Sequence, residues 1–119
     1  MDLDEEDVEI VIDEYGTKRW YQNGFLHRLD GPAIEWKEGG KEWYVNGELH
    51  RLDGPARIWI DGTKVWFQQN ILHRDDGPAV EQYFGRKKTF DYWIHGKKLD
   101  VPNDKRLTMK QLKLYITFM

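Results

Sequence analysis

The sequence repeats one motif three times with a constant period of 23 residues. The copies run from Trp20 to Ala33, from Trp43 to Ala56 and from Trp66 to Ala79, and no insertion separates equivalent positions. A period in this range is typical of repeat proteins, in which each unit buries its apolar side chains by stacking on its neighbours. We therefore expect function to depend on a surface that several copies form together.

Each copy contains the signal for a tight β-hairpin. An aromatic stretch leads to Asn23-Gly24 in the first copy and to Asn46-Gly47 in the second. This dipeptide predicts a type I′ turn, because both central residues of that turn need a positive φ. In the third copy Asn70 replaces the glycine, and asparagine tolerates the left-handed region better than most residues do. The backbone requirement is thus kept in all three copies.

After the turn, each copy continues with His-Arg-x-Asp-Gly-Pro-Ala. We interpret Asp-Gly-Pro as a bend, because proline lacks the N–H that a central strand donates. A second strand-like stretch follows, Ala33 to Trp36 in the first copy, and ends at the turn residues Gly39-Gly40. Two strands per repeat, joined by short turns, predict an antiparallel meander with Trp20, Trp43 and Trp66 along one face.

The two ends of the chain do not contain the repeated motif. We predict a single repeat domain that consists of the repeats and these two ends. Its parts are an acidic arm (1–7), which we expect to be disordered, an entry edge strand (8–14), three repeats (15–38, 39–61 and 62–84), a degenerate fourth repeat (85–100) and a C-terminal cap (101–119). Residues 108–119 fit a helix or a strand, and Thr108 with Gln111 resembles a capping box, which favours a short helix. The predicted fold class is therefore mainly β, an antiparallel meander or solenoid of tandem hairpin repeats with a C-terminal cap.

Composition narrows the classes of protein further. The chain has no cysteine, which excludes disulfides and thiolate chemistry, and no apolar run approaches the ~20 residues that cross a bilayer. Residues 1–14 contain eight acidic and no basic side chains, whereas residues 85–119 contain nine basic and three acidic ones. We expect a soluble, cytoplasmic protein that makes no membrane contact. Its oppositely charged ends could fold against each other or attract partners of opposite charge, but the interpretation that we favour is that both ends are simply solvated.

The repeated bends hold the most obvious candidates for chemistry, represented by His50, Arg51 and Asp53. We interpret them as structural: aspartate caps the bend, arginine reaches that aspartate or a carbonyl of the neighbouring repeat, and histidine donates to a backbone oxygen in the same corner. Catalysis needs one asymmetric site, whereas the repeat offers the same groups three times. Equivalent histidines would stand ~10 Å apart, too far to share a metal ion. We expect no catalytic residue, no metal and no cofactor.

A binding function remains, with two kinds of partner. An extended sheet that exposes Trp, Tyr and Arg suits a protein partner, whereas basic and aromatic residues near residues 86–98 leave open a nucleic-acid-binding module. Self-association through the C-terminal cap also remains open. The candidate binding residues are Trp20, Trp43, Trp66, Arg28, Arg51, Arg74, Arg86, Lys87, Lys88 and Trp93.

The period, the aromatic pair at the start of each unit and the turn glycines resemble the MORN-type repeat, which is also a 23-residue β-hairpin unit. The order Asn-Gly, His and Gly-Pro is closer to divergent relatives of that repeat in bacterial antitoxin-like modules and small phage proteins. The resemblance covers Tyr15 to about Lys98, and Arg28-x-Asp30 departs from it by replacing a glycine-rich stretch. It implies a phage or bacterial accessory factor that inhibits or recruits a host protein in the host cytoplasm.

Overall fold

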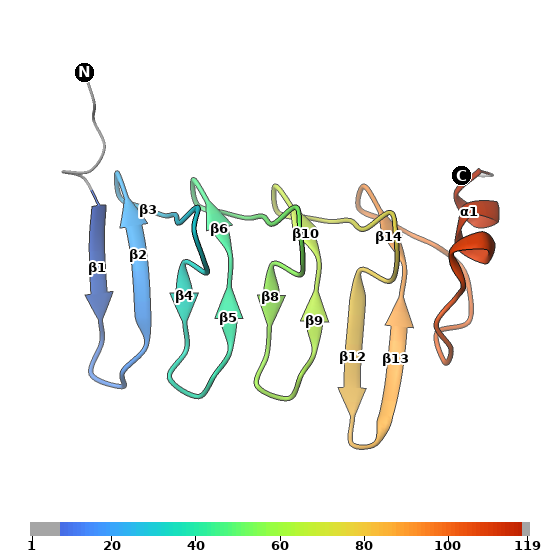
Figure 1. Cartoon of the computed structure of the whole chain (residues 1–119), viewed down its shortest axis with the longest axis horizontal. Coiled ribbons are helices and arrows are strands. Elements are labelled where there is room, and N and C mark those ends of the chain that lie inside the picture. The colour runs from blue at the N-terminus through green and yellow to red at the C-terminus, as the bar shows by residue number, and fades with distance from the viewer. Residues whose placement is uncertain (1–7, 118–119) are drawn as a thin grey trace.

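The structure is a computed structural model that describes residues 8–117. The predicted acidic arm, residues 1–7, and the last two residues of the predicted cap lie outside the described residues. The protein is a thin antiparallel meander with principal extents of 48 × 37 × 17 Å (Figure 1). The prediction of a mainly β repeat meander that ends in a short helix is confirmed.

One long sheet carries the repeats from the first to the last, and a row of small hairpins lies above it (Figure 1). The main sheet pairs its strands in chain order: β1 (Val8–Ile12), β2 (Lys18–Gln22), β4 (Ile34–Glu35), β5 (Lys41–Glu42), β8 (Arg57–Ile58), β9 (Lys64–Val65), β12 (Val80–Phe84) and β13 (Lys87–Asp91). The upper hairpins consist of β3 (Phe25–Leu26), which pairs with β2, and of β6 (Tyr44–Val45) with β7 (Glu48–Leu49), β10 (Phe67–Gln68) with β11 (Ile71–Leu72) and β14 (Trp93–Ile94) with β15 (Lys97–Lys98).

The upper hairpins correct one prediction, that of two strands per repeat. In the second repeat the chain forms β5, then β6 and β7, and then β8, which makes four short strands. The Asp-Gly-Pro bend interrupts the returning strand, so its upper part forms the small hairpin and its lower part joins the main sheet. The upper hairpins of neighbouring repeats are also joined by single backbone hydrogen bonds, such as that from the Asn70 N–H to the Leu49 carbonyl. Each repeat therefore contributes strands both to the main sheet and to an upper hairpin.

The tight turns have the backbone that the sequence predicts. Asn23 and Gly24 have φ values of 51° and 82°, and Asn46 and Gly47 have 50° and 82°. In the third copy both central residues, Gln69 and Asn70, are non-glycine and still have positive φ values of 51° and 64°. In the fourth copy His95 (48°) and Gly96 (79°) repeat the same geometry. All four upper hairpins therefore close with the same left-handed turn.

A row of alternating large and small side chains forms the centre of the sheet. The backbone N–H of each repeated tryptophan donates to the carbonyl of an alanine: Trp20 to Ala33, Trp43 to Ala56 and Trp66 to Ala79, at 2.8, 2.7 and 2.7 Å. The strand registers place Ala33 between Trp20 and Trp43, and Ala56 between Trp43 and Trp66. All three alanines are completely buried. A small residue between two indoles lets a sheet with no covering layer bury its centre.

The fourth unit ends the row against the cap. Tyr92 takes the place of the repeated tryptophan, and Leu99 takes the place of the repeated histidine. Both pack with Leu112 of helix α1 (Met109–Thr117) in a buried cluster, and the Tyr92 hydroxyl accepts a hydrogen bond from the Leu107 N–H at 2.7 Å. The predicted capping box is present, because Thr108 and Gln111 exchange side-chain-to-backbone hydrogen bonds. The cap therefore packs on the last repeat.

Candidate functional site

Each bend arginine lies on the tryptophan of its own repeat. The guanidinium carbons of Arg28, Arg51 and Arg74 stand 3.9 Å from the ring centroids of Trp20, Trp43 and Trp66. In the third repeat Arg74 also donates Nε to Asp76 at 2.9 Å and a terminal nitrogen to the Pro78 carbonyl at 3.0 Å, and the other two repeats make equivalent bonds. The interpretation that arginine pairs with the bend aspartate is confirmed. The carbonyl it reaches belongs to its own repeat, not to the neighbouring one.

The glycine of each bend makes room for this arrangement. A Cβ atom at Gly31, Gly54 or Gly77 would stand 2.9, 2.8 or 2.6 Å from the guanidinium carbon of the arginine three positions earlier. The guanidinium is thus held between an indole ring on one side and the bare glycine backbone on the other. In the first bend the hydrogen bond from Arg28 to Asp30 lowers the pKa of that carboxyl.

The bend histidines join neighbouring repeats. The Nδ1 atoms of His27, His50 and His73 accept hydrogen bonds from the N–H groups of Asn46, Gln69 and His95, at 2.9, 3.1 and 2.9 Å. The prediction that histidine donates to a backbone oxygen in its own corner is therefore wrong. The left-handed turn of the next repeat directs an N–H at the ring, and only an unprotonated nitrogen can accept it.

His73 is the most buried of the three junction histidines. Its side chain lies against the ring of His95, with the two centroids 4.2 Å apart. Burial lowers the pKa of His73, and the neighbouring His95 ring lowers it further. The neutral ring that the hydrogen bond requires is therefore also the form that this environment favours.

This junction predicts a loss of stability in mild acid. Because the folded pKa of His73 is below the ordinary value of about 6.5, the unfolded chain takes up a proton first as the pH falls. We expect the urea concentration at which half of the protein is unfolded to fall as the pH drops below that value. The fall should end once the pH is also below the pKa of His73 in the folded protein. The variant His73→Gln, measured with the wild type at each pH, should show a smaller drop. Equal drops in the two proteins would contradict this role of His73.

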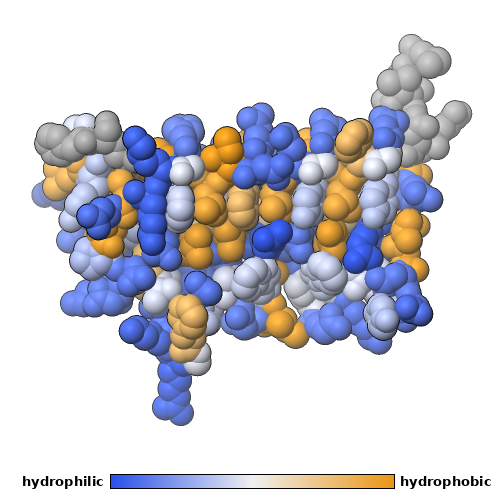
Figure 2. All heavy atoms as spheres, turned by 180° about the vertical axis from the view of Figure 1, so that it is seen from behind, coloured by the Kyte–Doolittle hydropathy of each residue, from blue (hydrophilic) through white to orange (hydrophobic). Residues whose placement is uncertain are grey.

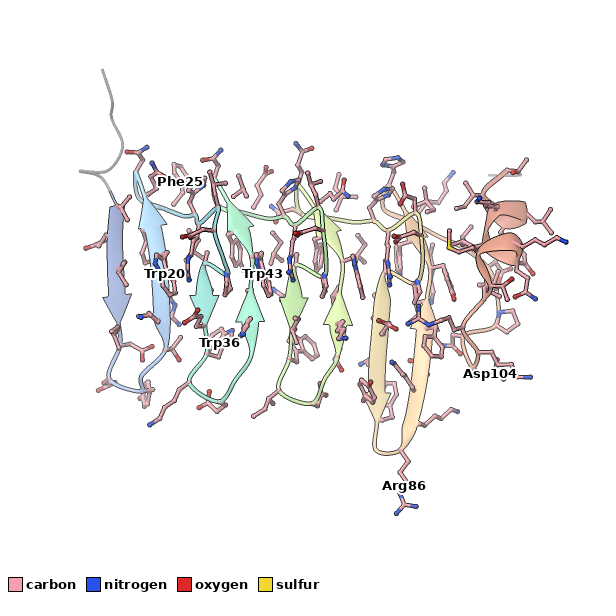
Figure 3. The ribbon with its side chains drawn as sticks, in the orientation of Figure 1. Trp20, Phe25, Trp36, Trp43, Arg86 and Asp104 are labelled. Carbon is pink, nitrogen blue, oxygen red and sulfur yellow. The ribbon has the colours of Figure 1, made fainter. Side chains whose placement is uncertain are left out.

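The face of the main sheet that carries the three stacked tryptophans, here called the groove face, has three hollows. The first, of about 570 Å³, lies between β1 and the first bend and includes Val8, Ile10 and Trp20. The second, of about 560 Å³, lies between the first two bends beside Trp43. The third, of about 370 Å³, lies between the second and third bends beside Trp66. The hollows thus recur with the repeat, and Figure 3 shows Trp20 and Trp43 at the same height of the sheet.

The ridges between the hollows carry protruding apolar side chains. Leu29 is 80% exposed and Leu52 is 75% exposed, and each lines the hollows on both sides of its bend. The third bend has Asp75 at the same position. The carboxylates of Asp30 and Asp53 are also exposed, at 86% and 88%, while their arginine partners lie deeper. The rim of the groove face therefore presents apolar and acidic groups outward.

Leu29 and Leu52 were not among the residues that sequence reasoning selected. They occupy the variable position of Arg-x-Asp, to which the sequence analysis assigned no role. An apolar residue in a three-residue bend next to proline is itself a signal, because such a position is normally exposed. The predicted residues Trp20, Trp43 and Trp66 instead form the floor of the hollows, covered in part by their arginines.

The opposite face carries a second aromatic surface, centred on Glu42. Its carboxylate accepts hydrogen bonds from the Trp36 indole at 2.8 Å and the Tyr44 hydroxyl at 2.9 Å, and pairs with Arg57 at 3.3 Å. Burial and the nearby Glu42 raise the pKa of Tyr44. Trp36 and Trp59 line an open hollow of about 470 Å³ on this face. Figure 2, seen from behind, shows hydrophobic side chains in stripes that run parallel to the strands.

The basic residues of the predicted nucleic-acid surface lie apart from the groove face. Arg86 and Lys87 are exposed at the turn between β12 and β13, and Figure 3 shows Arg86 projecting from the lower tip of this hairpin. Lys88 instead turns back to Glu81, with Nζ 3.6 Å from its carboxylate. Trp93 is half-buried in β14. The structure therefore does not bring Arg86, Lys87, Lys88 and Trp93 into one site.

Two further findings concern other kinds of site. Among residues 8–117, no group of three or more His, Asp or Glu side chains is arranged to hold a metal ion. No helix in the same range is long and apolar enough to cross a membrane.

Comparison with protein-family models, with curated proteins and with solved structures finds no match to this chain. The resemblance to MORN-type repeats therefore stays a prediction that rests on the sequence motif.

Proposed function

We propose that this protein is a non-enzymatic binding protein that engages another protein through its groove face. The observation that carries the proposal is the series of three hollows separated by the exposed ridge residues Leu29 and Leu52. The two leucines and the hollows beside them follow one another along a single face, and an apolar surface that is continuous in this way is typical of an interaction site. The partner would place one side chain in each hollow.

The spacing of the hollows fits a regular segment of a partner protein. Each repeat adds two strands to the sheet, so equivalent hollows stand ~10 Å apart. A helix that crosses the repeats places residues seven positions apart on one face at about that interval, and a polyproline II segment does so with every third residue. Because the ridges present carboxylates beside leucines, the partner should combine apolar side chains with lysine or arginine.

The proposal predicts that one charge on a ridge removes binding. Leu52→Asp should weaken partner binding by at least about tenfold, because an apolar contact is replaced by a solvated charge, while stability hardly changes at so exposed a position. The measurement is capture of partner proteins from cell lysate by immobilised wild type and variant. Ile60→Asp, at a 70% exposed position on the opposite face, is the matched control.

Lys87→Glu completes the set of variants, because it tests the nucleic-acid alternative at the exposed tip of the β12–β13 hairpin. Binding that survives Leu52→Asp but is lost with Lys87→Glu, and that weakens steeply with salt, would contradict the groove and favour a nucleic acid. Binding lost with Ile60→Asp alone would contradict it in favour of the opposite face.

A further inference from the structure

The sheet ends differently at its two edges. At the last strand, the Phe90 N–H donates to the Asn103 carbonyl at 2.8 Å, so the segment that leads to helix α1 covers part of β13. The helix then packs on Tyr92 through Leu112. At the first strand, no other strand among residues 8–117 pairs with the outer side of β1. The C-terminal edge is therefore capped by the described chain, and the N-terminal edge is open.

The peptide groups on the open edge can be assigned from the strand register. Ile10 lies opposite Trp20, and Trp20 directs its own N–H away from β1 to Ala33. In an antiparallel pair, the peptide N–H and C=O groups of two opposite residues either all point toward the partner strand or all point away from it. The N–H and C=O of Ile10 therefore face the open side. Alternation gives the same direction to Val8 and Ile12. The Asp13 N–H, which donates to Thr17, agrees with this assignment because it points inward.

The open strand carries one exposed charge, Glu9, but lacks the other features that usually protect an edge. Its sequence Val-Glu-Ile-Val-Ile contains no proline, lysine or glycine, and it pairs with β2 without a bulge. Ile10 and Ile12 are 53% and 62% exposed. Natural edge strands are typically short, charged or bulged, because an unpaired edge invites another strand. An apolar edge of this kind is typical of a surface that receives one.

We propose that β1 receives an extended segment of a partner protein as an additional strand, and that this segment alternates apolar residues and is flanked by lysine or arginine. The inference rests on the proposed binding function and names the partner's form at this edge. Strand addition supplies affinity through main-chain hydrogen bonds and specificity through alternate side-chain pockets. The hollow of about 570 Å³ beside Val8, Ile10 and Trp20 borders β1 on the groove face, which is one of the two faces toward which alternate side chains of the added strand would point.

Charge selects a basic partner over a second copy of this chain. The segment before β1 contains Asp2, Asp4, Glu5, Glu6 and Asp7, and Asp13 and Glu14 follow the strand. Because acidic residues flank β1 on both sides in the sequence, two copies paired along this edge would bring carboxylates together at the ends of the strand pair. Like charges directly opposite destabilise a strand pair, whereas lysine or arginine at these positions would be attracted.

The test is an NMR titration in which the synthetic peptide Lys-Lys-Val-Thr-Val-Thr-Val-Lys-Lys is added to the full chain. We expect binding, with the amides of Ile10 and Ile12 gaining protection from hydrogen exchange. Ile10→Pro removes an outward N–H without removing a bond to β2, and should weaken binding at least about tenfold. Ile10→Thr keeps the peptide group and should bind within about threefold of the wild type. Unchanged indole N–H resonances would show that both variants fold.

Several results would overturn the inference. They are an absence of binding by the wild type up to about 1 mM peptide, equal binding by Ile10→Pro, or equal binding of a peptide with glutamate in place of lysine. A wild-type dimer in sedimentation that Ile10→Pro converts to monomers would assign the edge to a second copy instead. Leu52→Asp lies one repeat away from β1 and should not affect the peptide. If peptide binding fails while capture of partners still depends on Leu52, the edge inference is wrong and the groove proposal stands.

Discussion

Leu112→Ala should lower the free energy of unfolding by about 2–5 kcal/mol, the range expected when a fully buried leucine is truncated and leaves a cavity. Leu112 is completely buried and is the one buried residue of helix α1. It packs on Tyr92 and Leu99 in the buried cluster at the end of the sheet. Urea unfolding, followed by circular dichroism and by tryptophan fluorescence, would measure the loss.

The helix supplies its own control for this prediction. Leu114 is 59% exposed in the same helix, so Leu114→Ala should change the midpoint very little. If both variants unfold like the wild type, the cap does not stabilise the sheet. If Leu112→Ala melts the helix and leaves the tryptophan transition unmoved, the cap and the repeats unfold as separate units.

Arg74→Ala is the second change with a large expected effect, a loss of about 2–4 kcal/mol of stability. The substitution removes a side chain that is only 18% exposed and whose guanidinium stacks on Trp66 at 3.9 Å, and it leaves the carbonyl of the buried Pro78 without its donor. A desolvated cation–π contact and an unmade buried hydrogen bond each contribute on the order of 1–2 kcal/mol. Thermal and urea unfolding would both report the change.

Two variants show whether the stack, and not charge alone, carries this effect. Arg74→Lys keeps the charge but cannot lie flat on the indole or bond in two directions, so it should recover less than half of the loss. Arg86→Ala removes an exposed arginine at the β12–β13 turn and should leave stability unchanged. Full recovery with lysine would mean that the position requires only a positive charge.

The backbone of this fold was predictable because its signals are local. Asn-Gly requires a left-handed turn and Asp-Gly-Pro requires a bend, whichever residues lie far away in the sequence. The substitution of Asn70 for glycine, and its φ of 64°, illustrate how closely the sequence follows the backbone. The capping box at Thr108 resolved the choice between helix and strand in the same local way.

The contacts between repeats were harder to predict, because they depend on register. Nothing near His50 in the sequence indicates that its ring accepts a hydrogen bond from Gln69, nineteen residues later. The split of each returning strand into two pairings also depends on which neighbour it meets. One signal for these contacts is present in the sequence: Leu99 stands at the histidine position of the fourth copy. A leucine cannot accept a hydrogen bond from the turn of a following repeat.

The candidate surface was predictable in its location but not in its chemistry. The repeated tryptophans and arginines do lie together on one face, yet they hold one another and form the floor of the hollows. The groups that reach outward are Leu29 and Leu52, at the position we treated as variable. Repetition identified the residues that stabilise the fold, while the exposed position between arginine and aspartate changes from leucine in the first two copies to Asp75 in the third.

The hydrogen bonds between repeats also bear on how this chain is inherited. All three junctions share the bond from a turn N–H to a histidine Nδ1, although the second adds a bond from the Leu49 N–H to Asn70 and the third adds the His73–His95 stack. An in-frame duplication or deletion of one unit would therefore produce a junction that can form the same histidine bond. The first strand, the fourth unit and the cap differ from the three repeats and would keep their own neighbours after such an event. The number of repeats, and with it the number of hollows offered to a partner, is thus free to change by recombination within the gene while the fold stays intact.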